Sequence, residues 1–337
     1  MKWSCSLRCS FWILLLLGAG SLPLLLGLKD TLNLIVLQRP GWKNMERSPE
    51  QNDTRGLQEE VQRRTQALRR RLLDSVCSRY KLGVTDPVVS PAKMRMVWAE
   101  DKSRLLYCAV PKASCSNWKR VLMVLAGSAH SAQDIPHHTV HYHNPVPLLS
   151  RFNLEGVLER ISTHTKVLFT REPFERLVSA FRDKFENPNG YYHSMFGRAI
   201  ISRYRANASR SALSSGDGVT FREFVQYLVD PRRPVGIDSH WKQVSELCHP
   251  CMIHYDFIGK FENINSEANF LLRSIGAPPH VVFPDFKDRN PQDQRTSSSI
   301  MMRYFSQLNA TEQQGVYDFY RKDYLMFNYS KPLPHLL

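Results

Sequence analysis

Short apolar runs alternate with amphipathic segments along most of the chain. Three runs of five or six residues have the apolar content of buried strands, at 105–110, 166–170 and 257–261. Each is followed by apolar residues at helical spacing, at 117–125, 173–185 and 265–275. Strands that alternate with helices predict an α/β fold with a mostly parallel central sheet flanked by helices. Ligands of such folds bind in the loops that follow the strands.

The first forty residues follow a different pattern. Residues 11–28 carry no charge and have the minimum length of a membrane-spanning helix. Because Lys2 and Arg8 precede this run, we expect residues 1–10 to be a cytosolic tail and the rest of the chain to be luminal. A cleaved signal peptide is the alternative, since residues 19–21 are small. The apolar run continues past those residues, which favours a signal-anchor.

A stem at 29–86 is predicted to join this anchor to a luminal domain at 87–337. The stem opens with Pro, Gly and polar residues. Apolar residues then recur at helical spacing among many Arg and Glu residues, at Leu57, Val61, Leu68, Leu72 and Val76. The pattern indicates a basic amphipathic helix that is either solvated or lies on the domain.

Glycosylation signals support a secretory route. Four Asn-x-Ser/Thr sequences begin at Asn52, Asn207, Asn309 and Asn328. Asn328 is flanked by apolar residues, which predicts that it is buried.

Five cysteines lie beyond the predicted anchor, at Cys77, Cys108, Cys115, Cys248 and Cys251. An odd number leaves at least one thiol unpaired within a single chain. Cys248 and Cys251 form a C-x-x-C pair without a second such pair, so zinc is not expected. A local or a long-range disulfide suits an oxidising lumen better.

The charge of the chain narrows the class of ligand. Lys and Arg number 45 against 31 Asp and Glu, a formal net charge of +14, which suits anionic ligands. With 42% hydrophobic and 23% charged residues, the chain is not collagen-like, mucin-like or wholly disordered. The predicted anchor and the glycosylation signals argue against nucleic acid as a partner. No pattern in the sequence fixes the oligomeric state.

Two strand-to-helix loops carry candidate anion ligands. Residues 111–117 join a buried strand to a helix N-terminus, where free N–H groups and the helix dipole favour an anion. Lys112 and two serine hydroxyls complete a phosphate cradle, although the loop is not a Walker A sequence. In the second loop Arg171 ends a strand, and Ser179 follows two helical turns later. The first loop alone could be an ordinary strand–helix connection. The second could be a helix N-cap ion pair, with Arg176 and Glu172 on the surface.

The segments PKASCSNWKR and REPFERLVSAFRDKF resemble the 5′-phosphosulfate and 3′-phosphate binding motifs of Golgi carbohydrate sulfotransferases. These enzymes use 3′-phosphoadenosine 5′-phosphosulfate (PAPS). The similarity runs from about Leu106 to Leu325 and is greatest to N-acetylgalactosamine 4-O-sulfotransferases and their chondroitin and dermatan relatives. SNWKRVLMVLAG, DKFENPNGYYH and RPVGIDSHW resemble most the enzymes of glycoprotein glycans. Ser114 stands where Gly is expected.

The resemblance implies a P-loop-like sulfotransferase fold, anchored in the Golgi membrane, and an acceptor glycan that contains N-acetylgalactosamine. It implies that Lys112 faces the bridging oxygen of PAPS, and that Arg171 and Ser179 hold the 3′-phosphate. The implied donor-binding positions are Pro111, Lys112, Ala113, Ser114, Cys115, Ser116 and Asn117 in the first loop and Arg171, Glu172, Pro173, Phe174, Glu175, Arg176, Leu177, Val178 and Ser179 in the second.

Sulfuryl transfer is an in-line displacement that requires positioning, charge stabilisation and a general base. We expect Lys112 to stabilise charge and His141 to act as the base, because related enzymes have a His at this place and a His of near-neutral pKa suits the task. A Glu is the other class of base. His240 is a weaker candidate for contacting the sugar, and Arg289 and Arg295 are weaker candidates for binding anions. No metal is expected, since no D-x-D or H-E-x-x-H pattern occurs.

Two other classes of protein share some of these features. A glycosyltransferase usually needs a carboxylate pair for a metal and a nucleotide sugar, and no such pair is evident. A non-catalytic glycan-binding protein of the Golgi fits the charge, but it does not require Lys112 and Arg171 on two strand-to-helix loops. Among acceptors, chondroitin or dermatan is the alternative to glycoprotein glycans.

Overall fold

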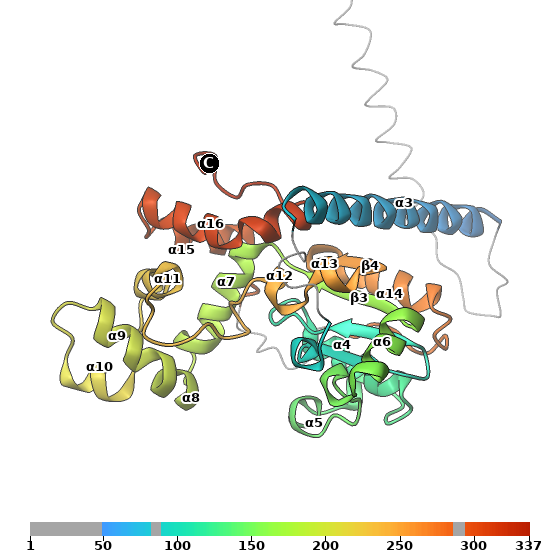
Figure 1. The fold of residues 1–337 in the computed structure, drawn as a ribbon, viewed down its shortest axis with the longest axis horizontal. Coiled ribbons are helices and arrows are strands. Elements are labelled where there is room, and N and C mark those ends of the chain that lie inside the picture. Colours follow the sequence, from blue (N-terminus) through green and yellow to red (C-terminus); the bar gives the residue numbers. More distant parts are fainter. Residues whose placement is uncertain (1–48, 82–88, 286–293) are drawn as a thin grey trace, which may run out of the picture. The chain divides into compact units, whose positions relative to one another are not determined.

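A computed structural model describes residues 49–81, 89–285 and 294–337 (Figure 1). The chain divides into two compact units at Gly56, and the larger unit, Gly56–Leu337, holds the sheet. The predicted tail and anchor at 1–28, and Arg289, lie outside the described residues. Within the described ranges, no helix is both long and apolar enough to cross a membrane.

Four strands form one sheet in the order β1 to β4: Val97–Glu100, Leu105–Cys108, Thr165–Thr170 and Phe257–Lys260. β1 runs antiparallel to β2, whereas β2, β3 and β4 are parallel. The predicted mostly parallel sheet is confirmed. β1 was not predicted, because the charged Glu100 interrupts its apolar pattern. The Glu100 carboxylate is buried, where it accepts the backbone N–H groups of Lys102 and Ser103.

The predicted helix after each parallel strand is present. α4 spans Cys115–Leu125, α7 spans Pro173–Phe181 and α14 spans Ile264–Ser274. α7 passes into a π-helical turn, Arg182–Glu186, so the helical segment predicted to end at 185 changes its winding before that residue.

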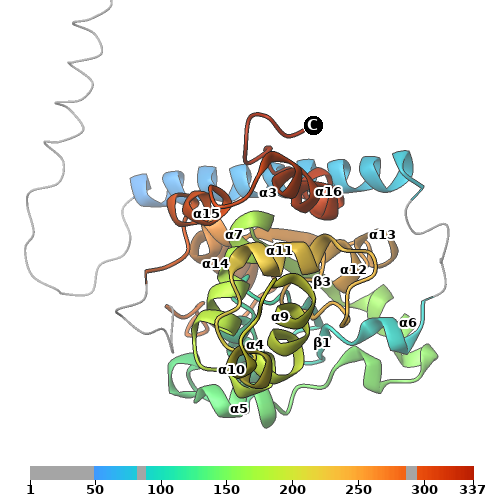
Figure 2. The ribbon, with the colours of Figure 1, turned by 90° about the vertical axis from the view of Figure 1, so that its left-hand side faces the viewer.

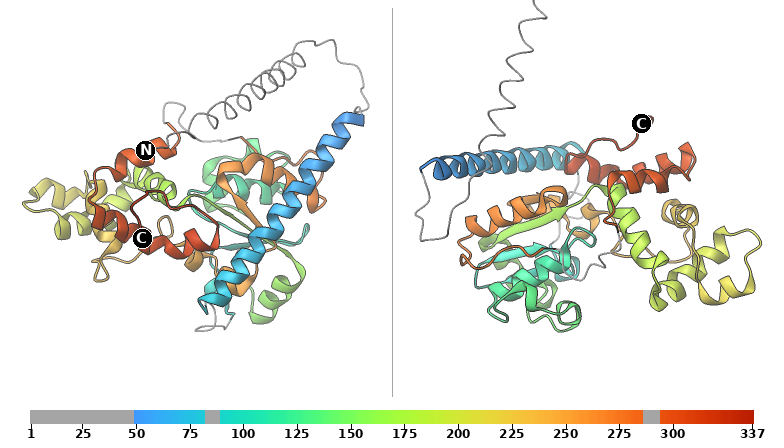
Figure 3. Two further views of the ribbon diagram at one scale, coloured as in Figure 1. Left: turned by 90° about the horizontal axis from the view of Figure 1, so that it is seen from above. Right: turned by 180° about the vertical axis from the view of Figure 1, so that it is seen from behind.

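The remaining helices have ten residues or fewer, apart from α3 and α16, which have 31 and 17. They are α3 Pro49–Arg79, α5 His137–Tyr142, α6 Leu154–Thr163, α8 Gly190–Tyr192, α9 Arg198–Tyr204, α10 Arg210–Ser215, α11 Phe221–Val229, α12 Val244–Leu247, α13 Pro250–Ile253, α15 Ser298–Phe305 and α16 Ala310–Met326. Helices α8 to α11 gather at one end of the larger unit, away from α4 to α6 (Figures 1 and 3).

Alternate residues of the sheet enter two different apolar clusters, as the period of two in a strand requires. Tyr107 and Val167 pack on one face with Trp118 of α4. Leu106 and Leu168 pack on the other face with α3 and α6. α3 and α5 accordingly lie on opposite sides of the sheet (Figures 1 and 2). A third cluster joins α7 to α9, α11, α15 and α16.

The amphipathic helix predicted within the stem lies on the domain. Arg69 of α3 pairs with the buried Glu267 at 2.6 Å, and Gln66 exchanges hydrogen bonds with the backbone of Ile258. Leu73 and Val76 are buried against the sheet. This end of the stem therefore contributes to the core.

Two disulfides join distant parts of the chain, Cys77 to Cys251 and Cys108 to Cys248. Cys115 is left as a free thiol. The C-x-x-C pair thus takes part in two long-range bonds rather than a local one, and the odd thiol predicted from the count is present.

We predict that replacing both Cys77 and Cys251 by Ser lowers the free energy of unfolding by about 2–5 kcal/mol, because the bond restricts a long loop of the unfolded chain. Denaturant unfolding under non-reducing conditions measures the change. Cys115→Ser, which removes a thiol and no disulfide, is the matched control. Equal stability of the double variant and the control would contradict the prediction.

Candidate active site

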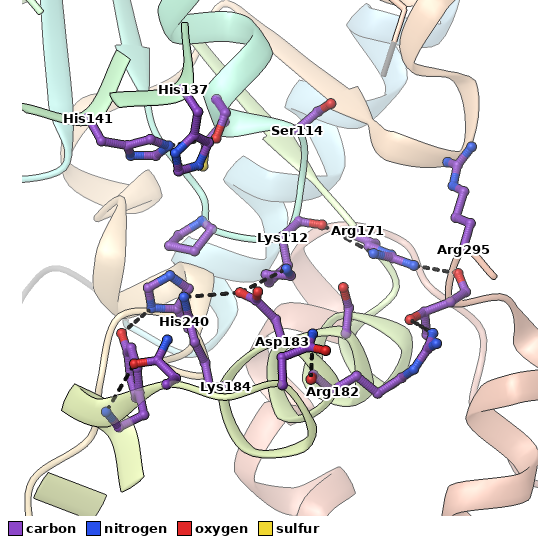
Figure 4. Close-up of a pocket in the computed structure, with 18 of the residues that line it drawn as sticks. Lys112, Ser114, His137, His141, Arg171, Arg182, Asp183, Lys184, His240 and Arg295 are labelled. Carbon is purple, nitrogen blue, oxygen red and sulfur yellow. Dashed lines mark hydrogen bonds and ion pairs between the residues drawn. The ribbon is translucent and has the colours of Figure 1, made fainter. Parts of the chain in front are cut away.

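The two predicted anion loops open onto one cleft of about 1000 Å³ (Figure 4). The residues of the two loops that line it are Pro111, Lys112, Ser114, Cys115, Ser116, Asn117, Arg171 and Ser179. Other lining residues include His137, His141, Arg182, Asp183, Lys184, Tyr192, His240 and Arg295. The sheet brings the loops together because β2 and β3 are adjacent and parallel, so both loops leave the same edge.

The first loop turns sharply between β2 and α4. Lys112 and Ser114 have φ values of +68° and +67°, a left-handed conformation that costs a non-glycine residue roughly 1–2 kcal/mol. Glycine adopts this conformation without a steric penalty, which explains why Gly is expected where Ser114 stands. Ala113 points into the core and does not line the cleft.

Two buried polar atoms of the cleft residues lack a hydrogen-bond partner among the described residues, Ser114 Oγ and Arg171 Nε. An unpaired buried donor is costly, so both atoms suit a ligand that accepts hydrogen bonds. One belongs to each predicted anion loop. These donors fit a ligand with anionic groups at two positions.

Lys112 is held by a carboxylate from the π-helical turn. Its Nζ lies 3.2 Å from Asp183 Oδ2, which also pairs with Lys184 at 3.0 Å (Figure 4). Burial lowers the pKa of Lys112, whereas Asp183 opposes that shift. Burial raises the pKa of Asp183, but the two lysines outweigh it and leave the pKa below its ordinary value. The cleft therefore holds two ammonium groups around one carboxylate.

Arg171 connects the second loop to its neighbours. Its guanidinium donates to Thr296 O at 2.6 Å and to Lys112 O at 3.3 Å. It also lies 4.4 Å above the ring of Phe261, and Arg295 lies 4.3 Å from the same ring. Arg295, a weaker candidate in the sequence, thus lines the cleft beside Arg171.

Within the segment 171–179 only Arg171 and Ser179 line the cleft. Pro173, Phe174, Leu177 and Val178 are buried. The Glu175 carboxylate lies 3.5 Å from Arg171, and the Glu172 carboxylate accepts hydrogen bonds from Tyr324 and from Glu175 N. The motif therefore supplies two cleft residues and a stretch of core helix.

Arg176 is fully buried and binds three backbone carbonyls. It donates to Pro111 O at 2.9 Å, to Lys242 O at 2.8 Å and to Ser239 O at 3.1 Å. It thus ties the first loop to the segment 239–242 from behind the cleft.

His141 faces the first loop. Its Nε2 lies 3.0 Å from Ser116 Oγ, and its ring centroid is 4.4 Å from that of His137. Burial, followed by the positive charge of Lys119, lowers the pKa of His141 to about 4, so the ring is neutral at pH 7. Asn117 lines the cleft, and its side-chain amide also donates to Pro284 O at 3.4 Å.

His240 lines another part of the cleft and pairs with a carboxylate. Its Nδ1 lies 2.6 Å from Asp238 Oδ1 and 3.0 Å from the hydroxyl of Tyr192. Trp241, by contrast, is fully buried in the core.

Sequence reasoning missed Arg182, Asp183, Lys184 and Tyr192 as cleft residues. The signal available for the first three was the charged run at the end of the quoted segment 171–185, beyond Ser179. The direction in which these three side chains point depends on the π-helical winding, because that winding changes the angular position of each side chain around the helix axis.

Residues 95–330 match the sulfotransferase family. The chain belongs to the sulfotransferase family. It is 57% identical to human carbohydrate sulfotransferase 8 over 81% of this chain and 64% of that protein. It is 52% identical to human carbohydrate sulfotransferase 9 over 80% and 60%, and 39% identical to rat carbohydrate sulfotransferase 11 over 73% and 70%. The chain thus matches less than two thirds of the length of the first two relatives. No solved structure matches it.

The resemblance seen in the two motifs is therefore confirmed at the level of the family. Within the described part of this sulfotransferase, no group of three or more His, Cys, Asp or Glu residues is placed to hold a metal ion.

A partly buried carboxylate, Glu172, directly follows Arg171. Glu172 accepts hydrogen bonds from the Tyr324 hydroxyl and from Glu175 N, and its own N–H donates to Glu262 Oε1 at 2.9 Å. Burial raises the pKa of Glu172 to about 7, although the bond from Tyr324 opposes the shift. The folded protein therefore holds this proton at pH values where the unfolded chain releases it.

We predict that the free energy of unfolding falls as the pH rises from about 4.5 to about 7, and that Glu172→Gln removes this part of the fall. The folded pKa exceeds the unfolded one, so stability is highest below pH 4.5, with a difference of up to about 3 kcal/mol. Denaturant unfolding across this pH range measures it. Glu246→Gln, at a half-exposed surface carboxyl, is the control, and identical slopes in both variants would refute the prediction.

Proposed function

We propose that this sulfotransferase transfers a sulfuryl group from PAPS to the 4-hydroxyl of N-acetylgalactosamine on glycoprotein glycans. The observation that carries the proposal is the single cleft in which Lys112 and Arg171 meet from two strand-to-helix loops. The printed names of the relatives, which are carbohydrate sulfotransferases, support a carbohydrate acceptor. The motif resemblance supports the 4-O position.

The donor fits the cleft through charge and hydrogen-bond donors. Ser114 lies at the N-terminus of α4 and lines the cleft, and its unpaired hydroxyl is proposed to contact the 5′-phosphosulfate. Arg171 and Ser179 are proposed to hold the 3′-phosphate, with Arg171 Nε as one donor. The β2–loop–α4 unit would act as a P-loop-like cradle without the glycines of a Walker A loop.

Catalysis would rest on positioning and on charge. The bond between sulfur and the bridging oxygen breaks, and negative charge grows on the departing phosphate. Lys112 is proposed to neutralise that charge after exchanging its contact with Asp183 for one with the donor. No metal is invoked.

The acceptor is tested by incubating the full-length protein with radiolabelled PAPS and a panel of glycans. We expect transfer to glycoprotein glycans that end in N-acetylgalactosamine, and weaker transfer to chondroitin and dermatan. Preferred sulfation of chondroitin or dermatan would replace the acceptor assignment. Binding of glycan without transfer to any acceptor would favour the non-catalytic alternative.

We predict that Lys112→Ala lowers kcat by about 10²–10³-fold, the usual loss when one preorganised charge partner is removed. Lys166→Ala is a matched control, because Lys166 also pairs with a carboxylate, Asp256, at 2.8 Å but does not line the cleft. Unchanged kcat in Lys112→Ala would contradict the assignment.

We also predict that Arg171→Lys weakens binding of adenosine 3′,5′-bisphosphate at least about tenfold and leaves binding of adenosine 5′-phosphate unaffected, since Lys lacks the forked donors of Arg.

We also propose that the protein is a single-pass type II protein of the Golgi membrane, anchored by residues 11–28. The positive charges of Lys2 and Arg8 before the apolar run, together with the glycosylation signals after it, support this orientation. Asn207, Asn309 and Asn328 are exposed, and the sequence-based prediction that Asn328 is buried is wrong. We expect full-length protein from secretory cells to remain in the membrane pellet at high pH and to shift in mass after glycosidase treatment. Release into the soluble fraction would support a cleaved signal peptide instead.

A further inference from the structure

The pairing of His240 with Asp238 fixes the position of a proton on the imidazole. The 2.6 Å contact joins His240 Nδ1 to a carboxylate oxygen, which can only accept. The same oxygen also accepts the backbone N–H of His240 at 2.9 Å and the hydroxyl of Tyr192 at 3.3 Å. The hydrogen bonds outweigh the effect of burial and keep the pKa of Asp238 below its ordinary value. Nδ1 therefore carries the proton, and Nε2 keeps its lone pair.

The lone pair on His240 Nε2 is available to a substrate. Among the described residues, no group is hydrogen-bonded to Nε2, and the side chain retains 26% of its exposure. His240 lines the cleft on the side that carries Lys112 and Lys184 (Figure 4). Burial lowers the pKa of His240, as do the charges of Lys184 and Lys112, whereas Asp238 opposes the shift. The ring is therefore neutral and able to accept a proton at pH 7.

His141 has a different environment. Its Nε2 faces Ser116 Oγ of the first loop at 3.0 Å, so the ring is engaged with the donor-binding loop. Within the described chain no carboxylate pairs with His141, and nothing comparable to Asp238 would stabilise an imidazolium there. Its pKa of about 4 is also far from the value that favours proton transfer at neutral pH.

We propose that His240 is the general base that accepts the proton of the acceptor hydroxyl, that Asp238 is its positioning residue, and that His141 positions Ser116 in the donor loop. The proposal rests on the proposed sulfuryl transfer. Lys112 marks the end of the donor where the bond breaks, and His240 lines the same cleft.

The step balances as follows. The acceptor oxygen forms a bond to sulfur while the bond between sulfur and the bridging oxygen breaks, and that electron pair leaves on the phosphate beside Lys112. The hydroxyl proton passes to His240 Nε2. The imidazolium so formed keeps its Nδ1 proton on the ionised carboxylate of Asp238, which stabilises the new charge.

The test compares His240→Gln and His141→Gln in the full-length protein. We expect His240→Gln to lower kcat by about 10²–10⁴-fold, the usual contribution of a general base, with affinity for adenosine 3′,5′-bisphosphate within about twofold of wild type. We expect His141→Gln to weaken that affinity more than it lowers kcat. His164→Gln is the matched control, because His164 also pairs with an aspartate, Asp101 at 3.0 Å, and does not line the cleft.

Asp238→Asn separates a positioning role from a structural one. Loss of the carboxylate removes support for the imidazolium, so the acid limb of the kcat profile should move to lower pH while bisphosphate affinity is kept. The other charged or titratable groups that act on this ring are Tyr192, Lys184 and Lys112, and all are unchanged in this variant. Imidazole added to His240→Ala should restore part of the rate.

Several outcomes would overturn the assignment of the base. One is a His240→Gln protein that retains more than about a tenth of wild-type kcat, and another is a His240→Gln protein that loses bisphosphate binding together with kcat. A third is a loss of kcat at unchanged affinity in His141→Gln alone. Failure of the wild-type protein to sulfate any acceptor would instead refute the proposed function, so the two failures are distinguishable.

Discussion

The buried guanidinium of Arg176 is the interaction on which the cleft depends. A charge removed from water must be surrounded by hydrogen bonds, and Arg176 obtains them from three backbone carbonyls in two separate segments. One carbonyl precedes Lys112, and the other two flank His240. A single side chain in the core thereby fixes the distance between the donor loop and the loop of the proposed base.

Two carboxylates lie beside basic side chains of the cleft. Asp183 lies between Lys112 and Lys184, and Asp238 lies behind His240. These carboxylates reduce the repulsion among the basic groups of the cleft when no anion is bound. Asp183, however, occupies the Lys112 ammonium, which the donor is proposed to contact.

The spacing of apolar residues predicted the parallel strands and the helices that follow them. Burial on both faces gives β2, β3 and β4 continuous apolar runs, and their helices show one apolar stripe each. β1 was not predicted because it contains Glu100. Hydrogen bonds from the following turn make burial of this carboxylate possible, and a pattern of apolar residues does not reveal such bonds. The π-helical turn was also not predicted, because its winding depends on packing and not on the spacing of apolar residues.

The sequence was sufficient to identify the two anion loops, the family and the presence of at least one unpaired thiol, because each depends on residues that are adjacent in the chain or on a simple count. It did not show that Arg176 faces the core while Arg171 faces the cleft, or that Cys77 and Cys108 pair with Cys251 and Cys248. Nor did it show that His240 has a carboxylate partner in a cleft shared with Lys112. Arg176 bonds to carbonyls 63 to 66 residues away, and the two disulfides join residues 174 and 140 positions apart, so these contacts exist only after the sheet and the helices have packed. Asp238 is close to His240 in the chain, but Lys112 is brought to the same cleft from a distant segment.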